Sequence, residues 1–332
     1  ELIATIKTDE TGIAKLENLP LGKYYVKETG TAYGHVLDGE IRHVDLTYVD
    51  QNTPVVVYDK DWQNNRQRVE VNVLKKENRT LEGAIFGLFA KEDIKSETTG
   101  KVLIEADEII ELKSTDEEGK ITFVADLPIG ATYYVKELYA PDGFVTNDEV
   151  KEFTFEYAGE DQPTVTYDFT FDNQPTVVEF TKSSLTTGKE LPGCKLKVVD
   201  ADGNIVDEWT SGKEAHVIRE LTVGKEYTLV ETKPADGYVT AESAKFTIKD
   251  TADVQKVEMK DDVTKVKISK QDIAGKELPG AKLTILDQDG KVVESWTSTE
   301  KAHYIEMLPI GKYTLREETA PDGYLVAKDV EF

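Results

Sequence analysis

One phrase recurs four times along the chain, and it limits the fold to a series of small, similar modules. The phrase starts at a Gly, alternates aromatic or aliphatic residues with polar ones and closes on a Glu, at 22–28, 130–137, 224–231 and 311–317. A second phrase, Leu-X-Gly followed by a small residue, recurs at 81–84, 191–194 and 278–281. Short alternating runs between turn signals such as Asp202-Gly203 predict strands. The fold class expected is therefore all-β: tandem Ig-like β-sandwich modules in an elongated string.

The spacing of the phrases divides the 332 residues into four modules. They are a partial module at 1–66 lacking its first strand, complete modules at 67–174 and 175–262, and a partial module at 263–332 lacking its last strand. The module at 67–174 carries an insertion, Glu92–Leu112, for which a short helix and an extra hairpin both stay open. Because the chain starts and stops inside a repeat, we expect it to be part of a longer protein.

Charge and cysteine content exclude several classes of protein. The 64 Asp and Glu residues outnumber the 40 Lys and Arg residues and give a net charge of -24, which opposes binding to nucleic acid or anionic lipid. The single cysteine, Cys194, allows neither an intramolecular disulfide nor a cysteine zinc cluster. It replaces Ala in the second phrase, so we expect it in the core as a small buried residue. No stretch has the apolar length of a membrane span, so no membrane insertion is expected.

Each module places polar residues on the apolar face of its strands, since alternate strand residues share a face. The three lysines end alternating apolar runs: Lys75, Lys182 and Lys270. The four glutamates close the repeated phrase: Glu28, Glu137, Glu231 and Glu317. The strand that closes each module contributes Asp59, Asn173 and Asp261 in the same way.

Such burial has a chemical consequence. Burying an isolated charge costs several kcal/mol, and it drives a lysine toward its neutral amine and a carboxyl toward its acid. A neutral amine is a nucleophile, an amide or protonated carboxyl beside it is an electrophile, and a buried Glu can move the proton. The pattern predicts an internal Lys-to-Asn or Lys-to-Asp isopeptide bond. The alternative is a salt bridge at the rim. At 1–66, Asn64 and Asn65 compete with Asp59 as acceptors.

No other constellation indicates chemistry. The histidines lack ligand spacing, so no metal and no cofactor are expected. The run Asp200–Asn204 fits a hairpin turn better than a calcium loop. Trp209 and Trp296 fit packing better than a carbohydrate platform. Apart from a single-turnover reaction with itself, the chain is not expected to be an enzyme.

These motifs resemble the collagen-adhesin B-type repeats, also called SpaA-like or prealbumin-like domains, of Gram-positive pilins and adhesins. The resemblance rests on Val266-Lys-Ile-Ser-Lys270, on the Gly-Ala after it, and on Tyr313-Thr-Leu-Arg-Glu317 with Ala320-Pro-Asp-Gly-Tyr324. The last two modules are especially similar to the parent domain of the SpyCatcher reagents. The resemblance implies a lysine donor, a glutamate catalyst and an Asn or Asp acceptor. Carried over residue by residue, it gives these sets: Lys75, Glu137 and Asn173; Lys182, Glu231 and Asp261; Glu28 and Asp59; Lys270 and Glu317.

The resemblance also implies a function. It favours the stalk of an extracellular, cell-wall-anchored protein, with neighbouring modules as its partners and any host ligand bound by regions outside this chain. The alternative is an adhesin whose own modules bind a host matrix protein or glycan.

Overall fold

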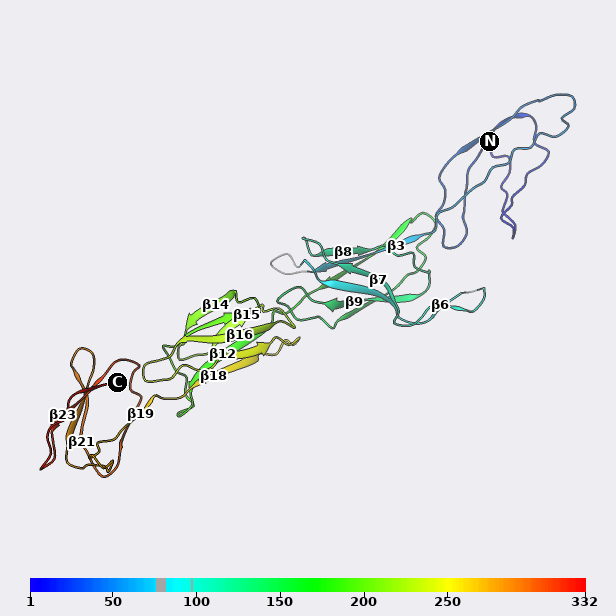
Figure 1. Cartoon of the computed structure of the whole chain (residues 1–332). Coiled ribbons are helices and arrows are strands. Elements are labelled where there is room, and N and C mark those ends of the chain that lie inside the picture. Colours follow the sequence, from blue (N-terminus) through cyan, green and yellow to red (C-terminus); the bar gives the residue numbers. More distant parts are fainter. Residues whose placement is uncertain (76–81, 97) are drawn as a thin grey trace. The chain divides into compact units, whose positions relative to one another are not determined.

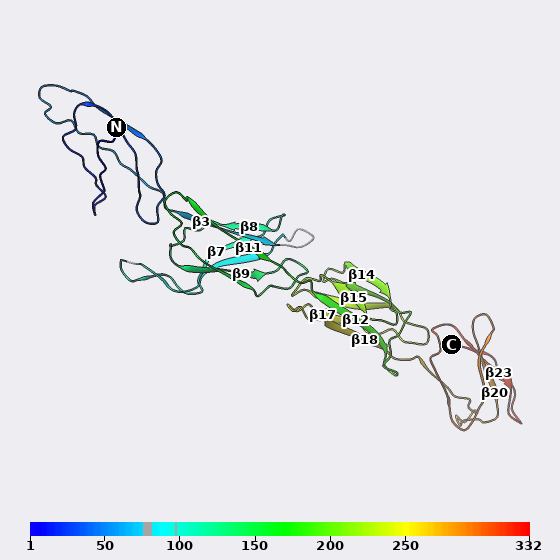
Figure 2. The ribbon, with the colours of Figure 1, turned by 180° about the vertical axis from the view of Figure 1, so that it is seen from behind.

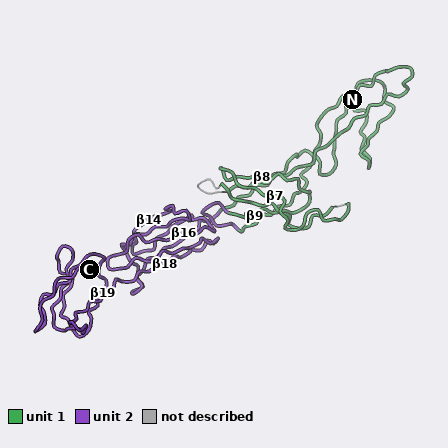
Figure 3. Tube along the Cα trace, viewed as in Figure 1, with its two compact units in different colours: residues 1–139, 148–172 green, residues 140–147, 173–332 purple. Residues whose placement is uncertain are grey.

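A computed structural model describes residues 1–75, 82–96 and 98–332. Every regular element in this part of the chain is a β-strand, as Figures 1 and 2 show from opposite sides, so the predicted all-β fold is confirmed. Leu81 of the second phrase lies outside the described residues. The chain divides into two compact units, 1–139 with 148–172 and 140–147 with 173–332 (Figure 3). In the described residues, no helix long and apolar enough to cross a membrane is present.

Residues 1–66 contain one small sheet, in which β1 (Gly22–Val26) pairs antiparallel with β2 (Arg42–Leu46). The prediction that Asp59 faces a core is wrong, because Asp59 is exposed, and so are Val55 (68%) and Val57 (71%), which would share its face in a strand. The physical reason is pairing: the corresponding strands of the next two modules lie against a lysine-bearing strand, and residues 1–66 provide none.

Two sheets form the module at 67–174. One has the order β11-β3-β8 and the other β10-β9-β4-β7, and their apolar faces enclose a core that includes Val71, Phe86, Tyr133 and Phe171. The strands are β3 (Arg68–Lys75), β4 (Ile85–Ala90), β7 (Ile109–Ser114), β8 (Lys120–Phe123), β9 (Thr132–Tyr139), β10 (Val150–Thr154) and β11 (Thr164–Phe171). The insertion Glu92–Leu112 holds an extra hairpin and no helix among its described residues: β5 (Ile94–Lys95) pairs antiparallel with β6 (Val102–Ile104).

The module at 175–262 repeats this plan. Its sheets have the orders β15-β12-β18 and β14-β13-β16-β17, and β12 and β18 run side by side in both views (Figures 1 and 2). The strands are β12 (Val177–Ser184), β13 (Lys195–Val199), β14 (Ile205–Thr210), β15 (His216–Arg219), β16 (Glu226–Lys233), β17 (Ala244–Thr247) and β18 (Gln255–Asp261). Asp200–Asn204 forms the turn between β13 and β14, as predicted.

The module at 263–332 has the same sheets with fewer strands. β19 pairs with β22, and the second sheet has the order β21-β20-β23-β24. Its strands are β19 (Lys265–Ile268), β20 (Lys282–Leu286), β21 (Val292–Thr297), β22 (His303–Glu306), β23 (Thr314–Thr319) and β24 (Val330–Glu331). A smaller core of Ile285, Ile305 and Leu308 lies between the two sheets.

A main-chain hydrogen bond recurs wherever one repeat follows another within a unit. The N–H of the first or second residue of a module donates to the carbonyl of a left-handed glycine in an earlier turn, at 2.9–3.0 Å: Gln67 to Gly34, Thr176 to Gly143 and Thr264 to Gly237. The Thr176 and Thr264 hydroxyls also donate to the carbonyls of Leu221 and Leu308. We call this arrangement the junction.

Substituting Gly237 tests the junction. Its φ is +85°, and a Cβ there would lie 2.6 Å from the Met307 carbonyl oxygen. Gly203 has the same φ, +85°, in the open turn after β13, with no atom within 4 Å of a Cβ. Gly203→Ala is expected to cost about 1–2 kcal/mol for the left-handed backbone alone. Gly237→Ala is expected to cost about 1–3 kcal/mol more, because main-chain atoms must move. Thermal unfolding of the two variants measures the difference, and equal losses would contradict it.

Candidate functional site

The register of the parallel strands β12 and β18 brings a lysine and an aspartate together. Lys182 pairs with Met259, and Ser184 pairs with Asp261. Because side chains alternate along a strand, Lys182, Met259 and Asp261 all face the interior. Asp261 therefore lies one inward position beyond the register partner of Lys182. The offset is repeated in the chain at 67–174, where Lys75 pairs with Phe171 and Asn173 follows two residues later.

Glu231 reaches the same point from the opposite sheet, on β16. The Lys182 Nζ lies 3.1 Å from Glu231 Oε1 and contacts Asp261 Oδ1 directly. All three side chains are at most 2% exposed. The backbone N–H of Ala241 donates to Glu231 Oε2 at 2.8 Å, which fixes the carboxylate. One ammonium group thus faces two carboxyl groups inside the sandwich.

Burial changes the acidity of this cluster. Desolvation raises the pKa of Asp261 from 3.8 to about 6, although the hydrogen bond and charge of Lys182 oppose the rise. A carboxyl with this pKa holds a proton far more readily than an exposed one. The cluster thus places an amino group against a carboxyl group. Those are the two partners that amide formation requires.

The pair at 67–174 is more completely buried. Lys75 on β3 and Glu137 on β9 lie in opposing sheets, with Nζ and Oε1 2.5 Å apart and both side chains 0% exposed. The ring of Phe86 lies 5.3 Å from the Lys75 Nζ. Taking two charges out of water costs several kcal/mol for each ion. Asn173, the predicted acceptor, is 5% exposed, and its amide Nδ2 donates to the Val145 carbonyl at 2.7 Å.

Glu28 has a different neighbour from the one predicted. Its half-buried Oε2 accepts the Nδ2 of Asn64 at 2.6 Å and the N–H of Asp38 at 2.7 Å. Asp59 lies on the surface. Of the acceptors that competed at 1–66, the structure thus brings Asn64 to the glutamate.

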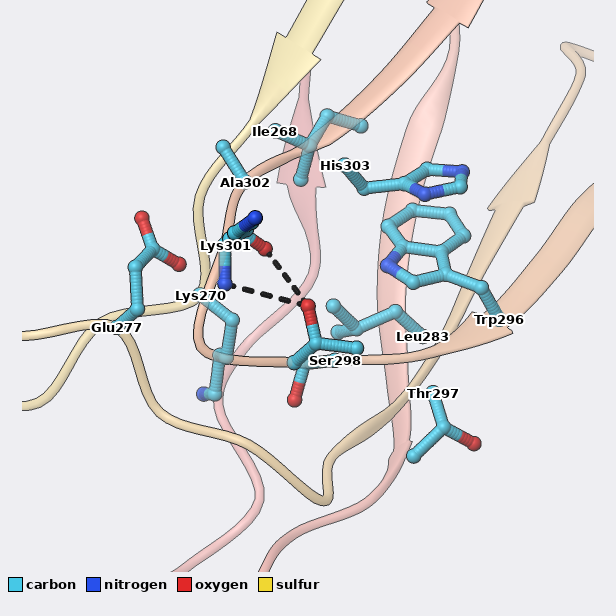
Figure 4. A pocket seen from close by; sticks show the side chains of 11 residues that line it. Ile268, Lys270, Glu277, Leu283, Trp296, Thr297, Ser298, Lys301, Ala302 and His303 are labelled. Carbon is cyan, nitrogen blue, oxygen red and sulfur yellow. Dashed lines mark hydrogen bonds between the residues drawn. The ribbon is translucent and has the colours of Figure 1, made fainter.

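Lys270 and Glu317 also meet, with Nζ 3.0 Å from Oε1 and 3.1 Å from Oε2. The Lys270 side chain is 17% exposed, more than its buried counterparts Lys75 and Lys182. It borders a small pocket of about 50 Å³ together with Glu277, Leu283 and Trp296 (Figure 4). The Ala327 N–H donates to Glu317 Oε2 at 2.6 Å, as Ala241 does to Glu231.

The repeated Trp and His residues are packing elements, as expected for Trp209 and Trp296. Trp209 lies 5.5 Å from the Phe180 ring and stacks on His216 at 4.2 Å. Trp296 stacks on His303 at 4.3 Å in the same way (Figure 4).

The chain matches a known family along almost its whole length. The family model described as the SpaA prealbumin-like fold domain matches residues 1–61, 68–172, 176–263 and 264–332. The chain belongs to this family. Its lysines and glutamates accordingly recur from one SpaA-type domain to the next.

Several solved structures are similar to these SpaA-type domains. The Bacillus anthracis TIE protein is 26% identical, with 81% of this chain and 49% of that chain covered and a TM-score of 0.43. This chain therefore spans about half of that protein. The major pilin subunit of Bacillus cereus is 17% identical over 80% of this chain and 95% of that one, with a TM-score of 0.33. The shaft pilin SpaA of Lactobacillus rhamnosus GG is 15% identical over 60% of this chain and 98% of that one, with a TM-score of 0.28. Among curated proteins, no relative was found.

The sequence did not indicate that Cys194 contacts Asp261 in the buried cluster at 175–262. The residue is fully buried, as predicted, and its Sγ lies 3.7 Å from Asp261 Oδ2. The burial of Cys194 could be predicted from its position in the repeat, because the alanines at the same position, Ala84 and Ala281, are small residues and are also buried. Its contact with a strand 67 residues away depends on how the sheets pack.

Proposed function

We propose that the SpaA-type domains at 67–174 and 175–262 each close an internal isopeptide bond and serve as tension-bearing stalk modules of a Gram-positive surface protein. The observation that carries the proposal is the buried contact of the Lys182 Nζ with both Glu231 and Asp261. A plain ion pair is a weak reason for such burial, because desolvation offsets most of its attraction.

The reaction we propose at 175–262 balances as a condensation. The neutral Lys182 amine attacks Cγ of the Asp261 acid, a C–N bond forms, and a C–O bond breaks. The departing oxygen leaves as water with one proton from the acid and one from the amine, and Glu231 carries the proton between them. At 67–174 the acceptor would be the Asn173 amide, so Lys75 would displace ammonia with Glu137 in the carrier role. Each site reacts once, so the domains are not enzymes in the usual sense.

The proposed bond lies where tension would enter and leave a module. Lys182 is on the first strand of its module and Asp261 is on the last, and the two strands are parallel neighbours. A covalent link between them carries tension past the residues in between. Neighbouring modules of the same protein are the expected partners, and the cell surface is the expected location.

Intact mass under denaturing conditions tests the proposal. The chain is expected to be lighter than its sequence by one ammonia and one water. Glu137→Ala is expected to restore the ammonia and Glu231→Ala the water, each relative to its own sequence, because the proton carrier is lost. A chain with its full sequence mass would refute the bonds.

A further inference from the structure

The Cys194 thiol lies against the carboxyl group that the proposed reaction consumes. Its Sγ is 3.7 Å from Asp261 Oδ2 and 3.7 Å from the Leu191 carbonyl oxygen. Desolvation raises the pKa of the thiol to about 11, so the sulfur keeps its proton at neutral pH. A protonated thiol is a hydrogen-bond donor, though a weak one.

The local fold does not require sulfur at this position. Ala84 and Ala281 occupy it in the neighbouring domains, and both are fully buried. The backbone N–H of each of these three residues donates to a side-chain hydroxyl oxygen at 2.9 Å. The acceptors are Thr115 for Ala84, Ser211 for Cys194 and Ser298 for Ala281. An alanine therefore supports the same turn, and the thiol is an addition found beside Asp261.

The acceptor at 175–262 also differs from the one at 67–174. The Asn173 side chain has distinct ends, and its Nδ2 is already engaged by the Val145 carbonyl at 2.7 Å. The two oxygens of Asp261 are chemically equal until their surroundings distinguish them. Lys182 contacts Oδ1, and Cys194 contacts Oδ2.

Resting on the proposed isopeptide reaction, we propose that Cys194 is a positioning residue that donates its S–H to Asp261 Oδ2 while Lys182 attacks. Negative charge builds on Oδ2 as the C–N bond forms, and a donor placed there lowers the barrier. Oδ1 keeps the proton of the acid, receives a second proton from the Lys182 amine through Glu231, and leaves as water. The S–H proton stays on sulfur throughout.

The test compares Cys194→Ala and Cys194→Ser with the parent chain. Unreacted full-length chain is recovered from insoluble expression in concentrated urea, folding is started by dilution, and loss of water is followed by intact mass. Cys194→Ala is expected to slow this loss by about threefold to tenfold, less than the ~10² typical of a strong oxyanion donor, because S–H is weak. Cys194→Ser is expected to restore it, because the hydroxyl donates from the same place.

Loss of ammonia from 67–174 in the same molecules is the internal control and is expected to be unchanged. Equal rates of water loss in Cys194→Ala and the parent would overturn the role of the thiol. Slowing in both variants alike would overturn it too, because only the sulfur volume would then matter. Absence of water loss from the folded parent would instead refute the isopeptide reaction itself.

Discussion

Pulled from its ends, the Glu231→Ala chain is expected to release about 26–28 nm of length that the parent withholds when the module at 175–262 unfolds. The length follows from the 79 residues that separate Lys182 from Asp261, at ~3.3–3.6 Å for each extended residue. In the parent, the proposed bond keeps those residues out of the path of tension. Without the Glu231 proton carrier, the bond does not form and the segment extends. Single-molecule force spectroscopy measures the step.

The matched control for this measurement is Glu226→Ala. Glu226 lies on the same strand, β16, and its side chain is 51% exposed, so its loss leaves the buried cluster intact. Like the parent, this variant is expected not to release the length between Lys182 and Asp261 when the module unfolds under force. A parent chain that itself releases 26–28 nm would show that no covalent link spans β12 and β18.

Replacing Lys182 is expected to give the largest loss of stability. Lys182→Met keeps an unbranched stem but leaves Glu231 and Asp261 as buried carboxyl groups without a cation. Leaving a buried carboxylate without a compensating cation costs about 3–5 kcal/mol. Loss of the covalent loop removes about 4 kcal/mol more, by analogy with a disulfide closing a similar loop. Chemical denaturation followed by tryptophan fluorescence measures the change, because Trp209, one of the three tryptophans, packs on the core of this module.

The same variant is expected to become sensitive to pH. Burial raises the Asp261 pKa to about 6, and losing Lys182 removes an influence that lowers it. A carboxyl whose pKa is raised on folding stabilises the fold fully below its unfolded value near 3.8, and this contribution is lost as the pH rises through the folded value. Lys182→Met is therefore expected to be more stable at about pH 5 than at about pH 7.

In the parent the proposed amide uses up both groups, so Asp261 no longer titrates and this pH dependence is expected to be absent. Lys233→Met, an exposed lysine on β16, serves as the control for the loss of a positive charge. It is expected to change the free energy of unfolding by less than about 0.5 kcal/mol. A parent with the same pH dependence as Lys182→Met would contradict the proposed use of Asp261.

The alternation of strand residues was enough to predict the buried cluster. Lys182, Glu231 and Asp261 each follow apolar residues two positions apart, so their inward direction could be derived without any contact information. The same reasoning failed for Asp59, which is exposed. Alternation says which face a residue takes only if the strand forms, and a strand forms only where another strand pairs with it.

Contacts between distant segments were beyond sequence reasoning. The proximity of Asn64 to Glu28 depends on how the chain folds back over a sequence separation of 36. The contact of Cys194 with Asp261 depends on the packing of the turn before β13 against the end of β18. For the insertion, local pattern left a helix and a hairpin equally open, and the pairing of β5 with β6 decided between them.

The junction has a consequence for how such a gene can evolve. Its recurring hydrogen bond joins a main-chain N–H to the main-chain carbonyl of a left-handed glycine, so it needs that glycine but no particular side chain on the donor residue. If recombination places a copy of one repeat after another, the N–H at the start of the copy can therefore form the same hydrogen bond to the glycine carbonyl of the preceding repeat. Duplication and deletion of repeats then change the number of modules, and each copied repeat brings its own turn glycine with it.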